Sequence, residues 1–372
     1  MILYLDNAAT SFPKPKEVID SVQKCLRICG NAGRSEHKMA MESANQIYLC
    51  RQELSDFFNY NNPENVIFTL NATYALNIAI NALYEEGTHV LISDLEHNAV
   101  YRPIQHLASQ NKITYSIFSH KGDILSNIKE QTKATTKLIV CTHASNVTGQ
   151  WLPIKEIGDY CAKNNIKFII DGSQSAGHHH INLGEINFSA FCAPAHKGLL
   201  GIQGCGFAII NTSDVERDFI LGGTGTHSFL PHMPLYLPDR YEAGTLPTPA
   251  ICGLRSGIAY LKSKQEALHE IENNTHYLHE QLKEIKQCRL VSKENLSGIA
   301  SFTCEEQAEF SSYCAKQHIC IRSGFHCAPL AHQSIHTEEG GCIRVSIGIF
   351  TRKKHIDQFL TLANNFFKKH SK

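Results

Sequence analysis

Short apolar runs alternate with segments of helical periodicity through the first two thirds of the chain. The runs are bounded by polar or turn-forming residues and are typical of buried strands. Between them, apolar residues recur at three- and four-residue spacing, as in 75–83. The expected strands are 2–5, 66–69, 89–92, 113–118, 138–141, 168–170 and 207–210. This alternation predicts an α/β fold with a mostly parallel sheet covered by helices.

The pattern changes near residue 250. A long helical region is expected at 250–288, followed by strands at 299–302, 319–322 and 342–347 and helices at 307–317 and from about 356. This second pattern is typical of a compact α+β unit. The sequence of 372 residues therefore predicts two domains: a large one at 16–249, and a smaller one that combines 1–15 with 250–372.

Polar residues follow several of the expected strands. His97 comes after the strand at 89–92, and Asn146 after the strand at 138–141. Ligand groups gather at the carboxyl ends of parallel strands, so these side chains are expected to lie together. Asp171 directly abuts an apolar strand, where an unpaired carboxylate is costly to bury. Asp171 is expected either to pair with a cation, such as a protonated ring nitrogen, or to cap a helix.

A helix mouth follows the strand at 66–69. Ala72 and Thr73 open it, and free backbone N–H groups, the helix dipole and a hydroxyl suit a phosphate there. The alternative is that Thr73 is an ordinary helix cap.

Lys197 lies in the stretch 193–204, beside His196 and ahead of several glycines. A lysine kept from bulk water can form an imine with a carbonyl cofactor when enough of its amine is neutral. The alternative is a solvated surface lysine.

The sequence contains 14 cysteines, scattered through apolar segments. Most are expected to be reduced core residues, and no spacing predicts a metal site. Cys327 differs because its loop also carries Arg322, His326 and His332, and nearby cations favour the nucleophilic thiolate. The alternative is a merely exposed cysteine. The tract His178-His179-His180 is either a metal tract or a polar turn.

Charge narrows the classes of partner. Lysine plus arginine equals aspartate plus glutamate at 35 each, which disfavours nucleic acid or a membrane surface as the main partner. No segment has the roughly 20 apolar residues of a membrane span, and the N-terminus lacks a secretory pattern. A small ligand and a cytoplasmic location are expected.

Eight short motifs occur in order along the chain: Asp6-Asn7-Ala8-Ala9-Thr10, Asn71-Ala72-Thr73, Glu96-His97-Asn98, Ser145-Asn146-Val147-Thr148-Gly149, Asp171-Gly172-Ser173-Gln174, His196-Lys197, Glu242-Ala243-Gly244-Thr245 and Arg322-Ser323-Gly324-Phe325-His326-Cys327-Ala328. Together they resemble the class V aminotransferase family of pyridoxal phosphate enzymes, which have fold type I. Within that family the chain is similar to cysteine desulfurases whose cysteine stands in an Arg-x-Gly-x-His-Cys-Ala segment.

The resemblance implies a role for each matching residue. Lys197 would bind pyridoxal 5'-phosphate as an imine and remove the substrate's Cα proton. Asp171 would pair with the pyridinium nitrogen, Gln174 would bond the phenolic oxygen, and His97 would stack on the ring and assist proton transfer. The phosphate would be held by Ala72, Thr73, His196 and, from the partner subunit of a homodimer, Thr245.

The substrate would be L-cysteine, held by Asn146, Arg322, His326 and Arg344, with Arg344 on its carboxylate. Cys327 would take the sulfur as a persulfide and release alanine. A sulfur-acceptor protein is the implied partner, as in iron–sulfur cluster assembly.

Other reactions remain open at this point. They are selenocysteine lyase, another class V C–S lyase or aminotransferase, and a non-catalytic sulfur-relay or metal-binding protein. The chain also departs from the family pattern at Pro194, Pro247 and Glu36. Pro194 replaces a phosphate-binding serine or threonine, for which Gly223 or Thr224 is the expected substitute.

Overall fold

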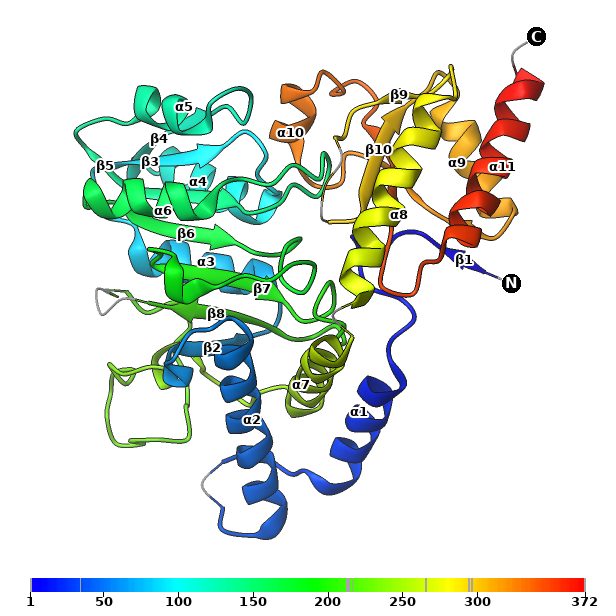
Figure 1. The fold of residues 1–372 in the computed structure, drawn as a ribbon. Coiled ribbons are helices and arrows are strands. Elements are labelled where there is room, and N and C mark those ends of the chain that lie inside the picture. Colours follow the sequence, from blue (N-terminus) through cyan, green and yellow to red (C-terminus); the bar gives the residue numbers. More distant parts are fainter. Residues whose placement is uncertain are drawn as a thin grey trace.

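The computed structural model describes residues 2–33, 35–211, 215, 217–264, 266–293, 295 and 297–370. Figure 1 shows the arrangement of its elements. In chain order the α-helices and strands are β1 (Leu3–Tyr4), α1 (Lys16–Ile28), α2 (Lys38–Phe57), β2 (Val66–Thr69), α3 (Ala72–Leu83), β3 (Thr88–Ser93), α4 (Asn98–Ser109), β4 (Ile113–Phe118), α5 (Ile124–Gln131), β5 (Thr136–Thr142), α6 (Ile154–Lys163), β6 (Lys167–Asp171), β7 (Ala190–Pro194), β8 (Gly206–Ile210), α7 (Thr248–Ser263), α8 (Glu266–Lys283), β9 (Arg289–Leu290), β10 (Ile299–Thr303), α9 (Gln307–Lys316), β11 (Ile319–Cys320), β12 (Arg322–Gly324), α10 (Pro329–Ser334), β13 (Cys342–Ser346) and α11 (Lys353–His370).

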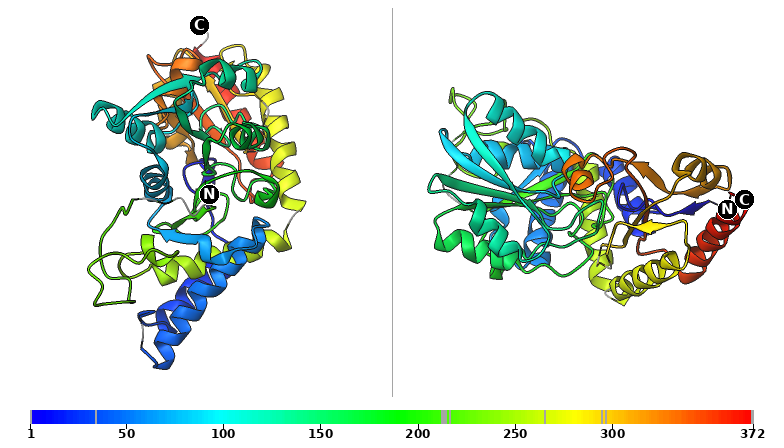
Figure 2. Two further views of the ribbon diagram at one scale, coloured as in Figure 1. Left: turned by 90° about the vertical axis from the view of Figure 1, so that its left-hand side faces the viewer. Right: turned by 90° about the horizontal axis from the view of Figure 1, so that it is seen from above.

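The large sheet has seven strands in the order β2-β8-β7-β6-β5-β3-β4. Strands β3 to β7 pair in parallel, while β8 pairs antiparallel with both β7 and β2. Figure 2 shows helices on both sides of this sheet. Successive residues of β3 point to opposite faces: Val90 and Ile92 belong to the hydrophobic cluster under α3 and α4, whereas Leu91 belongs to the cluster under α6. The predicted α/β fold with a mostly parallel sheet is confirmed.

The C-terminal part contains a second sheet, with antiparallel strands in the order β12-β13-β10-β9. Helices α8, α9 and α11 pack beside it. Strand β1 pairs in parallel with β11, so the first residues of the chain lie against this part, as Figure 1 shows. The segment between β1 and α1 then passes to the large sheet.

Several expected elements differ from the structure, most of the strands only by one or two residues at their ends. The helical region at 250–288 is two helices, because α7 packs on α1 and α2 whereas α8 packs on α11, β9 and β10. The expected strand at 319–322 is divided, since β11 pairs with β1 and β12 pairs with β13. The strand expected at 342–347 ends at Ser346.

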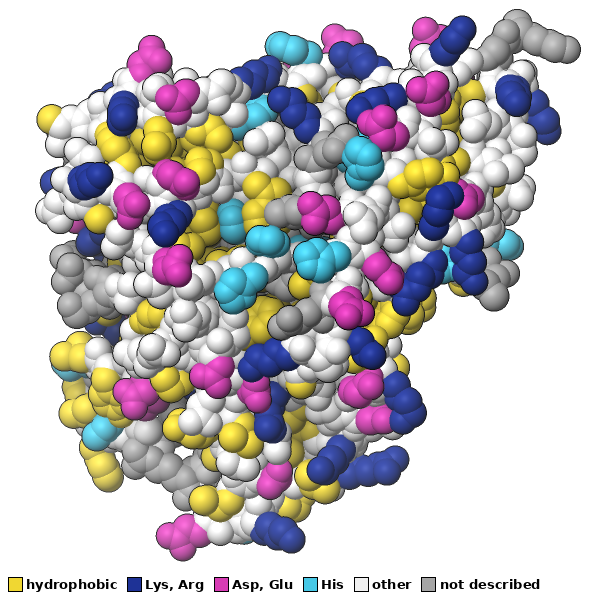
Figure 3. Space-filling view, viewed as in Figure 1, with side chains coloured by type: hydrophobic (Ala, Val, Ile, Leu, Met, Phe, Trp, Pro, Cys, Tyr) yellow, Lys and Arg dark blue, Asp and Glu magenta, His cyan; other side chains and the backbone are white. Residues whose placement is uncertain are grey.

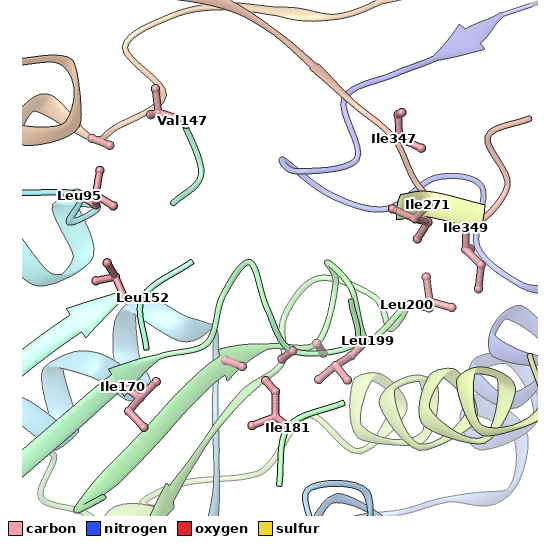
Figure 4. Close-up of a cluster of buried hydrophobic side chains, with 14 of the residues drawn as sticks. Leu95, Val147, Leu152, Ile170, Ile181, Leu199, Leu200, Ile271, Ile347 and Ile349 are labelled. Atoms are coloured by element: carbon pink, nitrogen blue, oxygen red, sulfur yellow. The ribbon is translucent and has the colours of Figure 1, made fainter. Parts of the chain in front are cut away.

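One continuous hydrophobic cluster joins the two parts. Figure 4 shows Ile170 of β6 and Leu199, after β7, in the same cluster as Ile271 of α8 and Ile347, after β13. The C-terminal part therefore packs directly on the core of the large sheet, next to the edge where β5, β6 and β7 end.

The face of the molecule seen in Figure 3 carries no single dominant charge. Figure 3 shows acidic and basic side chains interspersed on one face, with several histidines near its middle. His178 is buried and His179 and His180 are exposed in the turns after β6. Among the residues that the structure describes, no three His, Cys, Asp or Glu side chains are arranged to hold a metal ion. Within the same residues, no helix is both long enough and apolar enough to cross a membrane.

Candidate active site

A cavity of about 630 Å³, including its open mouth, lies at the carboxyl ends of the central strands. Eight of the predicted site residues line it: Ala72, Thr73, His97, Asn146, Asp171, Gln174, His196 and Lys197. They come from the last residue of β6 and from the segments that follow β2, β3, β5, β6 and β7. Thr245, Arg322, His326, Cys327 and Arg344 do not line this cavity.

Lys197 stands in a tight turn after β7. The N–H groups of Leu200 and Gly201 donate to the carbonyl oxygens of Lys197 (2.9 Å) and Ala195 (2.8 Å). A Cβ atom at Gly198 would lie 2.3 Å from the carbonyl oxygen of Ala176, so this position accepts only glycine. Burial lowers the pKa of Lys197 to about 8, with Asp171 opposing the shift. A usable fraction of this amine is neutral near neutral pH.

Asp171 is the last residue of β6 and is buried. Its Oδ1 accepts a hydrogen bond from the N–H of Ser173 (2.9 Å), and turns rather than a helix follow it. The helix-capping alternative is therefore wrong. A buried carboxylate at a cavity wall suits a cationic ligand group, such as a protonated ring nitrogen.

His97 caps helix α4. Its Nδ1 accepts from the N–H of Ala99 (3.0 Å), which places the ring proton on Nε2. Burial, aided by the charge of Lys197, lowers the pKa of His97 to about 4. The ring is therefore neutral at pH 7, with an apolar face and one N–H donor available at the cavity.

The first residues of helix α3 also line the cavity. Asn71, rather than Thr73, is the cap of this helix, because the Asn71 side chain accepts from the N–H of Tyr74 (3.1 Å). The threonine-cap alternative is therefore wrong, and the amides of Ala72 and Thr73, at the start of the helix, suit an anionic group. The buried Nδ1 of His196 has no partner in the described residues.

Pro194 ends β7 and lines the cavity without an N–H to offer. Gly223 and Thr224, the expected substitutes at the phosphate, do not line the cavity. Gly223 instead accepts from the N–H of Gly244 (2.8 Å). Thr245 is exposed on the same loop.

Gln174 and Asn146 each use their amide nitrogen on the protein's own backbone. Gln174 Nε2 donates to the carbonyl oxygen of Ala8 (2.9 Å), and its buried Oε1 has no partner in the described residues. Asn146 Nδ2 donates to the carbonyl oxygen of His326 (2.7 Å). Asn146 thus joins the cavity wall to the segment that carries Cys327.

Arg344 is almost completely buried on β13. Its Nη1 donates to the carbonyl oxygen of Asn146 (3.0 Å) and its Nη2 to Asp6 Oδ1 (2.9 Å). The buried Nε has no partner among the described residues. An unpaired guanidinium N–H is a site for one more acceptor, such as a carboxylate oxygen. Arg322 lies opposite Arg344 in the β12–β13 register and is exposed.

Cys327 is the only exposed cysteine of the 14. It and His326 both have left-handed backbone conformations, with φ of 58° and 48°. The Cys327 carbonyl oxygen accepts from the N–H of Asn98 (2.7 Å). His326 is buried, with Nε2 beside the Cys342 carbonyl oxygen (3.1 Å), and burial lowers its pKa to about 3. His326 therefore anchors the segment.

Several residues that shape the site were not predicted. Glu96 is fully buried at the end of β3, where Ser93 and the N–H of Thr142 donate to Oε1 while Oε2 has no partner in the described residues. Burial raises its pKa to about 8. Lys14 and Asp6 lie in an irregular segment whose partners come from distant strands, so no local periodicity identifies them.

The structure is thus an α/β protein whose cavity, at the carboxyl ends of the strands, is lined by an amine, a buried carboxylate and the start of a helix. Comparison with known proteins names the family. The sequence model of Aminotransferase class-V matches residues 3–359, so the chain belongs to that family.

Its relatives and structural neighbours agree with this assignment. A probable cysteine desulfurase of Methanothermobacter thermautotrophicus is 29% identical over 95% of this chain and 92% of its own length. The apo structure of the Thermococcus onnurineus NA1 cysteine desulfurase has a TM-score of 0.90 at 23% identity, covering 99% of this chain and 95% of that one. A lysine-to-alanine mutant of C-DES, with glycine covalently linked to its pyridoxal phosphate cofactor, has a TM-score of 0.82 at 20% identity, covering 97% and 96%.

Proposed function

We propose that this protein is a pyridoxal phosphate-dependent cysteine desulfurase, which converts L-cysteine to L-alanine and keeps the sulfur on Cys327 as a persulfide. One observation carries the proposal. The single exposed thiol of the chain is bonded through its backbone to Asn98, immediately after His97, beside the cavity that contains Lys197 and Asp171. Relatives named cysteine desulfurase along nearly the whole chain support the same reaction.

The residues fit the cofactor group by group. Lys197 offers an amine for the aldehyde, and Asp171 a carboxylate for the ring nitrogen. His196 Nδ1 and the start of α3 offer donors to a phosphate. Gln174 lines the same cavity, and its buried amide oxygen has no partner in the described residues. These unpaired buried groups support a polar ligand in the cavity.

Bound pyridoxal phosphate supplies a sink for the negative charge that develops at the Cα of an amino acid. Lys197, with a pKa of about 8, takes the Cα proton and returns it. Arg344 Nε binds the substrate carboxylate, and neutral His97 covers the ring.

The Cys327 thiolate then attacks the sulfur of the substrate. A new S–S bond forms as the substrate C–S bond breaks, and the C–S electron pair remains on the carbon that takes a proton and becomes the methyl group of alanine. The sum of cysteine and enzyme thiol equals alanine and enzyme persulfide, so no external oxidant or reductant is needed.

The test uses the cofactor spectrum and the products. Wild-type protein is expected to carry an absorbance band that borohydride shifts and that Lys197→Ala lacks. With L-cysteine and dithiothreitol, alanine and sulfide are expected in a one-to-one ratio. Cys327→Ser is expected to lose at least 99% of this activity, whereas Cys304→Ser, at a half-buried thiol, keeps it. Pyruvate in place of alanine would contradict the proposal and indicate a C–S lyase.

A homodimer with a shared site is part of the proposal. Exposed apolar side chains gather on α1, on α2 and in the 219–236 loop that precedes Thr245: Ile19, Leu26, Ile28, Met39, Met41, Tyr48, Phe219, Ile220, Leu221, Phe229, Leu230, Leu235 and Tyr236. Such a surface favours association with a second copy. Sedimentation is expected to give a dimer. The variants Lys197→Ala and Thr245→Asp are each expected to be inactive alone. Mixing the two is expected to restore activity, because in the hybrid dimer one site combines the intact Lys197 of one protomer with the intact Thr245 of the other.

The remaining expectations stay predictions. They are the two domains, 16–249 and 1–15 with 250–372, the cytoplasmic location and the sulfur acceptor. Transfer of sulfur to a thiol of another protein is the chemistry expected of an exposed persulfide. Incubating the persulfide form with candidate thiol proteins, and following the added sulfur by mass spectrometry, tests this last step.

A further inference from the structure

We propose that Lys14 is a positioning residue for Lys197, acting through the carbonyl group of His196. This inference rests on the proposed function only in that Lys197 binds the aldehyde of pyridoxal phosphate. It concerns the segment between β1 and α1, drawn in dark blue in Figure 1.

The carbonyl oxygen of His196 belongs to the peptide bond that leads into Lys197, and it is unusually crowded. Lys14 Nζ donates to it at 2.9 Å. The N–H of Ser11 (3.0 Å), the hydroxyl of Ser11 (3.1 Å) and the hydroxyl of Thr10 (3.1 Å) also lie within hydrogen-bond distance. A carbonyl oxygen has two lone pairs and needs no more than two donors, yet these four donor groups surround this one oxygen. The set fixes the position of this one peptide.

Lys14 is a costly residue to place there. Its ammonium is half-buried and donates only to Ser11 Oγ (2.7 Å) and the His196 carbonyl oxygen within the described residues. Burial lowers its pKa to about 8, and no acidic group of the described chain opposes that shift. An ammonium is strongly hydrated, whereas methionine would fill the same space without this penalty. The lysine therefore stabilises a particular geometry at the expense of overall stability.

The turn at Lys197 is held from its other side as well. A Cβ at Gly198 would lie 2.7 Å from Cδ2 of His178 and closer still to the Ala176 carbonyl oxygen. Lys197 is thus held between a packed glycine after it and the bonded carbonyl before it. Removing the Lys14 bond takes away the one cationic donor and leaves the weaker neutral donors of Ser11 and Thr10. The leading side is thereby loosened, which changes the direction of the Lys197 side chain while leaving the turn folded.

The test is a double-mutant cycle on cofactor affinity, measured by absorbance titration of the apo protein with pyridoxal phosphate. Lys14→Met is expected to weaken binding at least tenfold when Lys197 is present. In the Lys197→Ala background the same substitution is expected to change binding less than twofold, because no imine forms there. Lys14→Arg, which keeps a cationic donor, is expected to restore affinity to within threefold of wild type.

Lys16→Met is the matched control, since Lys16 lies two positions away, is exposed and pairs only with Asp20 in the described chain. It is expected to match wild type. If Lys14→Met does not fold, Lys14→Gln replaces it in the same cycle. Equal losses with and without Lys197 would mean that Lys14 supports the cavity as a whole and would overturn the inference, as would the absence of any loss. Failure of wild-type protein to form the absorbance band would instead overturn the proposed function.

Discussion

The backbone N–H of Asn98 donates a 2.7 Å hydrogen bond to the carbonyl oxygen of Cys327. Asn98 is the first residue of α4, directly after His97, whose side chain caps that helix. The first N–H groups of a helix have no partner within it, so this donor is available for a distant segment. The bond places the backbone of the exposed cysteine at the same helix end as a cavity-lining histidine.

Proline at position 98 tests this bond directly. Proline is tolerated as the first residue of a helix, and His97 already has the extended backbone (φ −71°, ψ 154°) that a following proline requires. Asn98→Pro therefore removes the donor while keeping the helix. We expect persulfide formation on Cys327, followed by mass spectrometry, to slow at least fivefold. Asn98→Ala keeps the N–H and is the control. Equal rates in the two variants would show that the bond does not position Cys327.

Glu96 predicts a pH dependence of stability. Burial raises its pKa from 4.5 to about 8, with Asp171 adding to the rise. Cys141 is a second titratable group close to it. Between the unfolded pKa of 4.5 and the folded pKa of about 8, Glu96 is protonated in the folded state and ionised in the unfolded state. The folded state therefore binds one proton more, and stability falls as pH rises through this window. This group alone lowers the free energy of unfolding by about 1.4 kcal/mol for each pH unit in that window.

Glu96→Gln removes this dependence. In urea unfolding from pH 5.5 to 7.5, the variant is expected to gain stability relative to wild type with each step in pH. Glu64→Gln, at an exposed carboxyl, is the control and should follow wild type. Parallel curves for wild type and Glu96→Gln would mean that Glu96 is ionised throughout the range.

The sequence predicts elements well where one period dominates, and it also predicts that candidate residues at or after strand ends lie together in one cavity. His97, Asp171 and Lys197 belong to this class, because the carboxyl ends of parallel strands meet at one edge. Lys14 and Asp6 do not. Their partners, the His196 carbonyl group and Arg344, are far away in sequence and are reached through an irregular segment. The pairing of β1 with β11 and the hydrogen bonds of Asn7 and Ala8 to Ser346 bring that segment to the site.

Replacing Asp6 is expected to lower the stability of the free protein while raising its affinity for the substrate. Its Oδ1 binds Nη2 of Arg344 at 2.9 Å and is the only carboxylate partner of this buried guanidinium in the described chain. In Asp6→Asn, a substrate carboxylate becomes the main counter-charge. We expect the KM for L-cysteine to fall about threefold while the melting temperature of the free protein falls by several degrees. Asp20→Asn, at an exposed ion pair, is the control. A rise in KM would show that Asp6 orients Arg344 and does not compete with the substrate.

The pair of Arg51 and Glu242 predicts the largest change in stability. Arg51 Nη2 donates to Glu242 Oε2, while Oε1 of the same carboxylate accepts from the N–H of Phe68 (2.6 Å). Both side chains are nearly buried, so the pair joins α2 and β2 to the loop that carries Thr245. Arg51→Met leaves a buried carboxylate without its counter-charge, which costs about 3–5 kcal/mol. Glu242→Gln keeps an acceptor for Phe68 without the charge and is expected to cost less.

Because the charge left behind causes the loss, the double variant Arg51→Met/Glu242→Gln is expected to be more stable than Arg51→Met alone. Urea unfolding of the four proteins measures this coupling. Additive losses would instead assign the stability to the other contacts of Arg51, which are the hydrogen bond from its Nη1 to the carbonyl oxygen of Val66 and its packing on the Phe68 ring, 4.8 Å from the ring centre. The charge of Glu242 would then have no part in holding the loop to α2.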